Sequence, residues 1–266
     1  MNKAPIIFFG NQKLVQGIKK DVATITDILQ AAGHETIATI TNKSGYEQLS
    51  ALLKQYPNSV GILASFGYIV PQEVIDLFEP LGILNIHPSI LPKYRGPTPI
   101  ETAILNGDNQ TGVSIMKISK SMDAGDIYTQ QSIDTSPDDN KFTLCDRLTR
   151  LGADMLVQVL DNTPKPTKQD HTQATFTQKL DKSMALLDPT KSATQLEREV
   201  RAFLSFPRSR ITLRDIDCII TTAHVSDTPQ TPDIDLLCSD GKYLCIDRLI
   251  PANSRDMAIQ AFLLGH

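Results

Sequence analysis

The sequence contains no tryptophan, and aromatic residues make up only 6% of its 266 residues. Proteins that stack single-stranded nucleic acid on aromatic platforms need more such side chains, so that class is not expected. No apolar run approaches the roughly 18 residues that a membrane-spanning helix requires. The first apolar stretch, PIIFF at 5–9, is too short for a secretory signal peptide. We therefore expect a cytoplasmic protein with no membrane partner.

Cysteine is scarce, with four residues at positions 145, 218, 238 and 245. None of them forms a C-x-x-C pair, and no histidine lies at a zinc-finger distance. We expect reduced thiols packed as small hydrophobic residues, and no metal site. The 26 basic and 30 acidic residues give a net charge of −4, which excludes a generic nucleic-acid binder. DNA is therefore not expected as a partner, although a local basic patch is compatible with this balance.

Short apolar strands alternate with helical periodicity through the first 160 residues. Strands are predicted at 5–9, 36–41, 60–64, 82–87, 112–118 and 126–133. Helices are predicted at 18–32, 46–55, after Pro71, 98–106 and 140–160. This alternation is typical of an α/β fold, a Rossmann-like domain with a mostly parallel sheet and helices on both faces.

A polar stretch with two prolines, DNTPKPTKQDHTQAT at 161–175, marks a change of pattern. We predict a catalytic domain over 1–163, a linker over 164–182 and a second domain over 183–266. The second domain opens with a helix at 192–204, capped by Ser192 or Thr194. Short strands follow at 209–214, 217–224, 234–238 and 242–250, and a helix closes the chain at 255–264. This pattern predicts a small, OB-like β-barrel.

Asn85 and His87 are two residues apart at the end of an apolar strand, which places both side chains on one face. Ligands of open α/β sheets bind beyond the carboxyl ends of the strands, so both side chains are expected in a ligand crevice. Taken alone, such a pair is more often structural, with Asn85 capping the loop and His87 packed as a buried residue. The next twelve residues, PSILPKYRGPTP at 88–99, contain four prolines and predict a rigid loop.

That loop, followed by SMDAGD at 121–126, resembles the formyltransferase family that uses 10-formyltetrahydrofolate. The resemblance covers residues 60–160 closely. It continues through TFTQKLDK (175–182) and QLEREVRAFLSFP (195–207), which are similar to the second domain of the methionyl-tRNA formyltransferases. It implies that Asn85, His87 and Asp123 are the catalytic trio. It also implies that the folate co-substrate is lined by Ser89, Ile90, Leu91 and Pro92.

The chemistry of this family agrees with those residue types. An amine attacks the formyl carbon, and negative charge develops on the formyl oxygen, to which Asn85 can donate. His87 can stabilise that charge and move protons, while Asp123 can orient the imidazole and favour its charged form.

Basic residues are the candidates for substrate binding. Lys93 and Arg95 lie in the proline-rich loop, where an RNA end or the folate glutamate tail are both conceivable contacts. Five arginines fall within 17 residues of the second domain. Arg198 and Arg201 share a helix face, and Arg208, Arg210 and Arg214 are expected on one face of a strand. They could contact tRNA phosphates or simply form a solvated face.

The resemblance thus implies formylation of the amino group of initiator methionyl-tRNA by a monomer. Two alternatives remain: a formyltransferase for a small amine, such as an amino sugar or glycinamide ribonucleotide, and a non-catalytic folate-binding or RNA-binding relative. The chain departs from the family between the second strand and the next helix. Only NKSGYEQLS (42–50) stands where the family carries a long basic loop that holds the tRNA acceptor stem.

Overall fold

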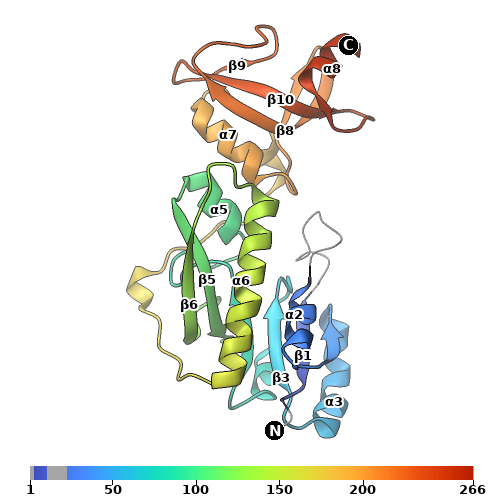
Figure 1. Ribbon diagram of the computed structural model, residues 1–266, viewed down its shortest axis with the longest axis vertical. Helices are drawn as coiled ribbons and strands as arrows, with labels where there is room; N and C mark the ends of the chain where they lie inside the picture. The colour runs from blue at the N-terminus through green and yellow to red at the C-terminus, as the bar shows by residue number, and fades with distance from the viewer. Residues whose placement is uncertain (1–2, 11–22, 266) are drawn as a thin grey trace. The chain divides into compact units, whose positions relative to one another are not determined.

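The computed structural model describes residues 3–10 and 23–265, and within them the chain folds into two compact units (Figure 1). The first unit comprises the chain up to Pro99 together with residues 110–135 and 142–178. The second comprises residues 100–109, 136–141 and the chain from Lys179 onward. The residues predicted as a linker are thus divided, because 164–178 pack as part of the first unit.

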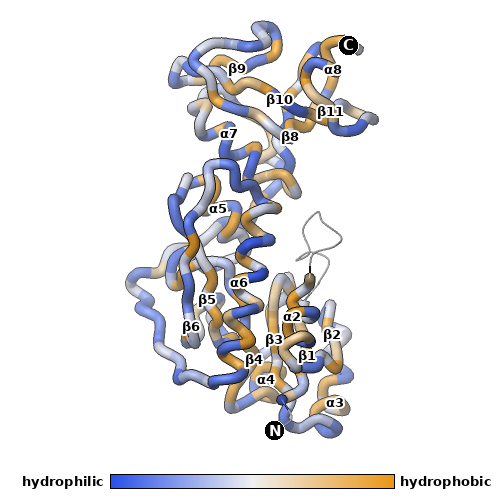
Figure 2. Tube along the Cα trace, in the orientation of Figure 1, coloured by the Kyte–Doolittle hydropathy of each residue, from blue (hydrophilic) through white to orange (hydrophobic). Residues whose placement is uncertain are grey.

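A six-stranded sheet with the order β2-β1-β3-β4-β5-β6 forms the first unit. Its strands are β1 (Ile6–Gly10), β2 (Thr36–Ile40), β3 (Val60–Ala64), β4 (Ile83–His87), β5 (Gln110–Lys117) and β6 (Ile127–Asp134). The first four strands run parallel, while β5 is antiparallel to both β4 and β6. The Rossmann-like, mostly parallel sheet predicted from the sequence is confirmed. Figure 2 shows hydrophobic residues concentrated along the inner strands β1, β3 and β4.

Helices cover both faces of this sheet. They are α2 (Ile25–Ala31), the 3-10 helix η1 (Lys43–Gln48), α3 (Leu49–Gln55), α4 (Gln72–Asp76) and α6 (Lys141–Asn162). On one face, Leu49 of α3 and Val74 of α4 join the strand residues in a single apolar cluster. On the other face, α6 comes so close to the sheet that a Cβ at Gly152 would lie 2.4 Å from Ile86 of β4. Only glycine at this position therefore allows α6 to pack this closely on the sheet.

Two predicted helices of the first unit differ from the structure. The described part of the helix predicted at 18–32 begins only at Ile25, where Thr24 forms a capping box with Asp27, and residues 18–22 lie outside the described residues. The helix predicted at 46–55 is η1 followed by α3. Gly45 lies within η1, and a Cβ there would meet Ile40 at 2.8 Å. The segment after β2 is thus a short helical turn packed on that strand.

The second unit contains an antiparallel, curled sheet with the order β11-β10-β8-β7, in which β9 also pairs with β10. Its elements are α7 (Ala193–Ala202), β7 (Arg210–Leu213), β8 (Ile216–Ser226), β9 (Leu236–Leu237), β10 (Tyr243–Pro251), β11 (Met257–Ala258) and α8 (Ile259–Gly265), with the 3-10 turn η3 (Lys182–Ala185) before them. Ser192 is the N-cap of α7, which decides between the two caps considered. Leu196 and Phe262 bring α7 and α8 into one core with β8 and β10. This is the small β-domain predicted from the sequence.

The helix α5 (Pro99–Asn106) is assigned to the second unit from Ile100 onward. Arg198 of α7 approaches the carbonyl of Asn106 at 3.4 Å, and Arg201 donates to the carbonyl of Asp139 at 2.6 Å. These contacts attach residues 100–109 and 136–141 to α7. No helix in residues 23–265 is long and apolar enough to cross a membrane.

Candidate active site

The candidate site is built at the carboxyl end of β4. In the register of the sheet, Asn85 lies between Leu63 of β3 and Met116 of β5, and His87 lies opposite Ser114. Ile86, which alternates with them, points to the opposite face and packs against α6. Both polar side chains are buried, at 6% and 4% exposure. The strand therefore presents an amide and an imidazole on one face, as the sequence predicts.

Asn85 has a largely buried side chain. Its side chain forms no hydrogen bond to any group in the described part of the chain. A buried amide usually finds a partner, because desolvating it without one is unfavourable. The Asn85 amide is therefore available to a ligand that reaches the carboxyl end of β4.

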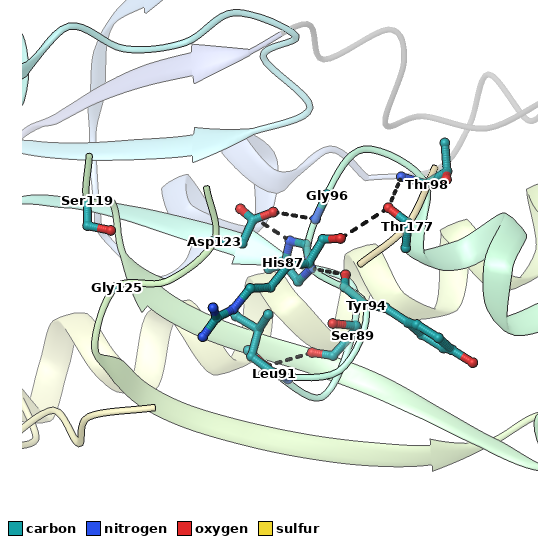
Figure 3. A network of polar contacts seen from close by, with 12 residues as sticks. His87, Ser89, Leu91, Tyr94, Gly96, Thr98, Ser119, Asp123, Gly125 and Thr177 are labelled. Atoms are coloured by element: carbon teal, nitrogen blue, oxygen red, sulfur yellow. Dashed lines mark hydrogen bonds and ion pairs between the residues drawn. The ribbon is translucent and has the colours of Figure 1, made fainter. Parts of the chain in front are cut away.

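His87 is fixed by two neighbours (Figure 3). Its Nε2 lies 3.0 Å from the carbonyl oxygen of Tyr94, and its Nδ1 lies 3.7 Å from Oδ1 of Asp123. A carbonyl can only accept, so Nε2 carries a hydrogen and Nδ1 is the atom that gains or loses a proton. Burial lowers the pKa of His87 below its ordinary value. The Asp123 carboxylate and the Tyr94 carbonyl oppose that shift, and the Arg95 cation adds to it.

Asp123 lies in the turn between β5 and β6. Its Oδ2 accepts a 2.7 Å hydrogen bond from the Gly96 amide, which leaves Oδ1 facing His87. Its φ of 48° is in the left-handed region, which is uncommon for a residue other than glycine. Two residues later, a Cβ at Gly125 would lie 1.8 Å from the Lys117 carbonyl, so only glycine fits. The turn SMDAGD thus aims one carboxylate oxygen at the imidazole.

The residues predicted to line the folate co-substrate lie in the loop that follows His87. Ser89 donates from Oγ to the Lys93 carbonyl at 2.6 Å, and Ser114 donates to the Ser89 carbonyl at 2.6 Å. The Leu91 amide donates to Ser114 Oγ at 3.0 Å, and its side chain packs with Met116 and Ile127. Ile90 and Pro92 are partly exposed. Their contact with the co-substrate stays a prediction.

The two basic residues of this loop differ sharply. Lys93 is exposed, with its Nζ 4.4 Å from the centre of the Tyr94 ring. Arg95, predicted as a substrate-binding residue, is only 4% exposed. Its guanidinium donates to Gln169 Oε1 at 2.6 and 3.1 Å and to His171 Nδ1 at 2.9 Å. Arg95 therefore binds other parts of the protein rather than standing free on the surface.

Gln169 is the functional candidate that the sequence reasoning missed. Its Nε2 donates to the carbonyls of Asp123 at 2.9 Å and Gly125 at 2.7 Å. It belongs to residues 167–178, a segment that runs beside the loop 92–98 and that we call the strap. The strap bonds to the loop at several backbone positions, among them Arg95 N to Thr175 O and Thr177 N to Arg95 O. A lone glutamine in a polar, proline-containing stretch carries no periodic signal, so nothing in the sequence singled it out.

The arginines of the second unit do not form one uniform patch. Arg201 is paired through two nitrogens with Glu197, and Arg210 contacts Asp217 at 2.6 Å. Among the described residues, the Arg198 side chain bonds only to the Asn106 carbonyl, at 3.4 Å, and Arg208 and Arg214 form no side-chain hydrogen bond or ion pair. The expectation that Arg208, Arg210 and Arg214 share a strand face is wrong. Only Arg210 lies in β7, and the other two have positive φ in the flanking turns.

The described residues contain no group of three or more histidine, cysteine or acidic side chains that could hold a metal ion. Cys145, Cys218, Cys238 and Cys245 are free thiols, and all but Cys145 are buried. Burial is the main cause that raises the pKa of the Cys218, Cys238 and Cys245 thiols. Raised thiol pKa values disfavour the reactive thiolate.

Residues 5–160 match the formyl transferase family model. The methionyl-tRNA formyltransferase of Desulfotalea psychrophila is 34% identical over 82% of this chain and 72% of its own length. That of Chloroflexus aurantiacus is 37% identical over 85% and 76%. Among solved structures, a methionyl-tRNA formyltransferase from Clostridium thermocellum has a TM-score of 0.67 at 18% identity, covering 96% of this chain and 99% of that one.

The structure of HypX from Aquifex aeolicus in complex with tetrahydrofolic acid has a TM-score of 0.75 at 18% identity. It matches all of this chain, which spans about half (47%) of the length of HypX. At such identities the two structures support the fold alone, and the family rests on the sequence matches. The chain therefore belongs to the formyl transferase family, and within it to the methionyl-tRNA formyltransferases.

Proposed function

We propose that this protein transfers the formyl group of 10-formyltetrahydrofolate to the free amino group of initiator methionyl-tRNA, and so supports translation initiation. The observation that carries the proposal is that Asn85 and His87 share one face at the carboxyl end of β4, with Asp123 3.7 Å from His87, in a chain of this family. An intact arrangement of this kind speaks against a binding protein without turnover.

Asn85 stabilises the charge that develops during transfer. When the amine attacks, the formyl C=O bond opens and its oxygen becomes an oxyanion. The Asn85 amide, which has no hydrogen-bond partner among the described residues, donates to that oxygen from a largely buried position, where such a hydrogen bond is strong. Loss of a comparable donor costs about 3 kcal/mol of barrier in other enzymes.

His87 and Asp123 handle the proton. The attacking nitrogen loses a proton as the new C–N bond forms, and N10 of the folate gains one as the old C–N bond breaks. Nδ1 of His87 is the basic atom, because Nε2 is occupied by the Tyr94 carbonyl. Burial keeps His87 neutral and able to accept the proton, and the Asp123 carboxylate then stabilises the imidazolium.

The acceptor assignment rests on the relatives and on the cations of the second unit. Arg198, Arg208 and Arg214 have no carboxylate partner among the described residues, so they are the arginines available to phosphates. Arg201 and Arg210 are already engaged by Glu197 and Asp217. We therefore assign tRNA contact to the first three, with the exposed Lys93 of the loop after β4 as a further candidate.

The proposal is tested by supplying 10-formyltetrahydrofolate with methionyl-tRNA, an amino-sugar nucleotide or glycinamide ribonucleotide, and following formyl transfer to each. We expect transfer to methionyl-tRNA, abolished in His87→Ala. Transfer to a small amine alone would replace the acceptor assignment. Absence of transfer to every acceptor, with folate still bound, would favour the non-catalytic reading.

A further inference from the structure

We propose that Gln169 is a positioning residue for the catalytic Asp123, and that the strap carries it into the active site. The expected effect on kcat rests on the proposed function, whereas the contacts of Gln169 do not depend on it. Gln169 is buried, at 7% exposure, and every polar hydrogen and the acceptor oxygen of its side chain are engaged.

The amide of Gln169 joins three separate segments. Its two Nε2 hydrogens go to the carbonyls of Asp123 and Gly125, in the turn that carries the carboxylate. Its Oε1 accepts from both Nε and an Nη of Arg95, in the loop after β4. A buried group saturated in this way fixes its neighbours, because releasing one partner leaves desolvated donors or acceptors behind.

These bonds close a ring around Asp123. The Gly96 amide holds Oδ2, and the preceding residue, Arg95, holds Gln169, which in turn holds the Asp123 carbonyl. The loop after β4 therefore holds both the backbone and the side chain of Asp123. Asp123 has a φ of 48°, and such a conformation persists only where the surroundings determine it. The clamp from Gln169 is what directs Oδ1 toward His87 Nδ1.

Gln169 also keeps a buried cation away from the carboxylate. Arg95 takes Gln169 and His171 as acceptors, and in the described structure it forms no ion pair with Asp123. An ion pair there would draw the carboxylate away from His87. Neutral acceptors hold the guanidinium instead, and the charge of Asp123 stays available to the imidazole.

The test compares Gln169→Ala and the isosteric Gln169→Glu with Gln173→Ala. Gln173 is an exposed glutamine of the same strap, and its replacement serves as the control. Glutamate keeps the acceptor for Arg95 but cannot donate to the two carbonyls. We expect both Gln169 variants to lower kcat for formyl transfer at least tenfold with little change in KM for the folate. Gln173→Ala should leave both unchanged.

A second readout needs no substrate. The His87 pKa is measured by NMR titration, with the signal assigned by its loss in His87→Ala and with His171 followed separately. The groups that act on His87 are Asp123, the Tyr94 carbonyl and Arg95. Asp123 raises the pKa of His87, so a displaced Asp123 in Gln169→Ala should lower it, and Asp123→Ala should lower it in the same direction. This pKa measurement tests the position of Asp123 even if the wild-type protein formylates none of the acceptors tried.

A double-mutant cycle separates positioning from general damage. If Gln169 acts through Asp123, the Gln169→Ala effect on kcat should vanish in an Asp123→Ala background. Equal losses in both backgrounds would overturn the proposal. So would a folded Gln169→Glu variant with wild-type kcat and an unchanged His87 pKa.

Discussion

The catalytic edge of the first unit and the arginines of the second are both clusters of polar side chains, yet they are built in opposite ways. At the edge, Asn85 and His87 are buried on a strand, and loop, turn and strap segments hold their neighbours. Around β7, the side chain of Arg210 is 44% exposed, and two of its arginine neighbours lie in turns. The side chains at the carboxyl end of β4 are thus buried among fixed neighbours, whereas the arginines around β7 are partly exposed and only some of them are paired.

The difference shows where a residue's role can be read from its spacing. A strand period of two determines which face Asn85 and His87 share, whatever surrounds them. A count of arginines, by contrast, does not show which of them are already paired. Glu197 and Asp217 engage two of the five cations, and only the fold shows which two.

The largest effect should come from the imidazole and the amide. We expect His87→Ala and Asn85→Ala each to lower kcat at least about 10²-fold, since both groups act on charge that develops in the transition state. Folate binding should change much less. Rapid-quench measurement of formyl transfer beside a folate binding titration checks this, and near-normal turnover of His87→Ala would refute the mechanism.

The variant Asp123→Asn tests the role of the carboxylate charge beside His87. The asparagine keeps the size but removes the carboxylate that raises the His87 pKa, so that pKa should fall further. Since neutral His87 is the active form, activity rises as pH passes upward through its pKa. The acid limb of kcat/KM should therefore move to lower pH, with kcat reduced by about tenfold or more. An acid limb that moves to higher pH would contradict this assignment.

The arginines offer a matched pair of variants. Replacing Arg198, Arg208 and Arg214 with alanine should raise KM for methionyl-tRNA and reduce its log–log salt slope by about two units, since each phosphate contact contributes somewhat less than one. Replacing Arg201 and Arg210 should alter the salt slope little, because both are held by carboxylates. Identical slopes in the two variants would make the whole region a solvated face.

The smallest effect concerns stability. Arg201 pairs with Glu197 four residues earlier and donates to the Asp139 carbonyl, and its side chain is 20% exposed. We expect Arg201→Ala to reduce the free energy of unfolding by about 1 kcal/mol, the usual scale for a partly exposed pair with one further hydrogen bond. Arg208→Ala, which breaks no described contact, is the control in denaturant titrations. Equal losses would remove the distinction between paired and unpaired arginines.

Much of this structure follows from local sequence. Alternating strands and helices predict the first sheet, and the N-x-H spacing places Asn85 and His87 on one face of a strand. The inclusion of Asp123, and the catalytic role of all three, came only from the family resemblance of the proline-rich loop and SMDAGD. The antiparallel placement of β5 and the strap at 167–178 were not predictable, because both depend on long-range pairing that no periodicity encodes. The same holds for Arg95, whose charge suggested a surface contact and whose partners, Gln169 and His171, follow it by more than 70 residues.

The division of the chain has a consequence for recombining its parts. Residues 100–109 and 136–141 belong to the second unit, although the chain on either side of them belongs to the first. A cut near residue 170 would also split the strap, since Thr175 and Thr177 lie beyond it. Neither unit is therefore one continuous stretch of gene. A chimera with a relative has to exchange residues 100–109 and 136–141 together with the chain from Lys179 onward. The contacts of Arg198 and Arg201 with the carbonyls of Asn106 and Asp139 then keep both partners from one protein.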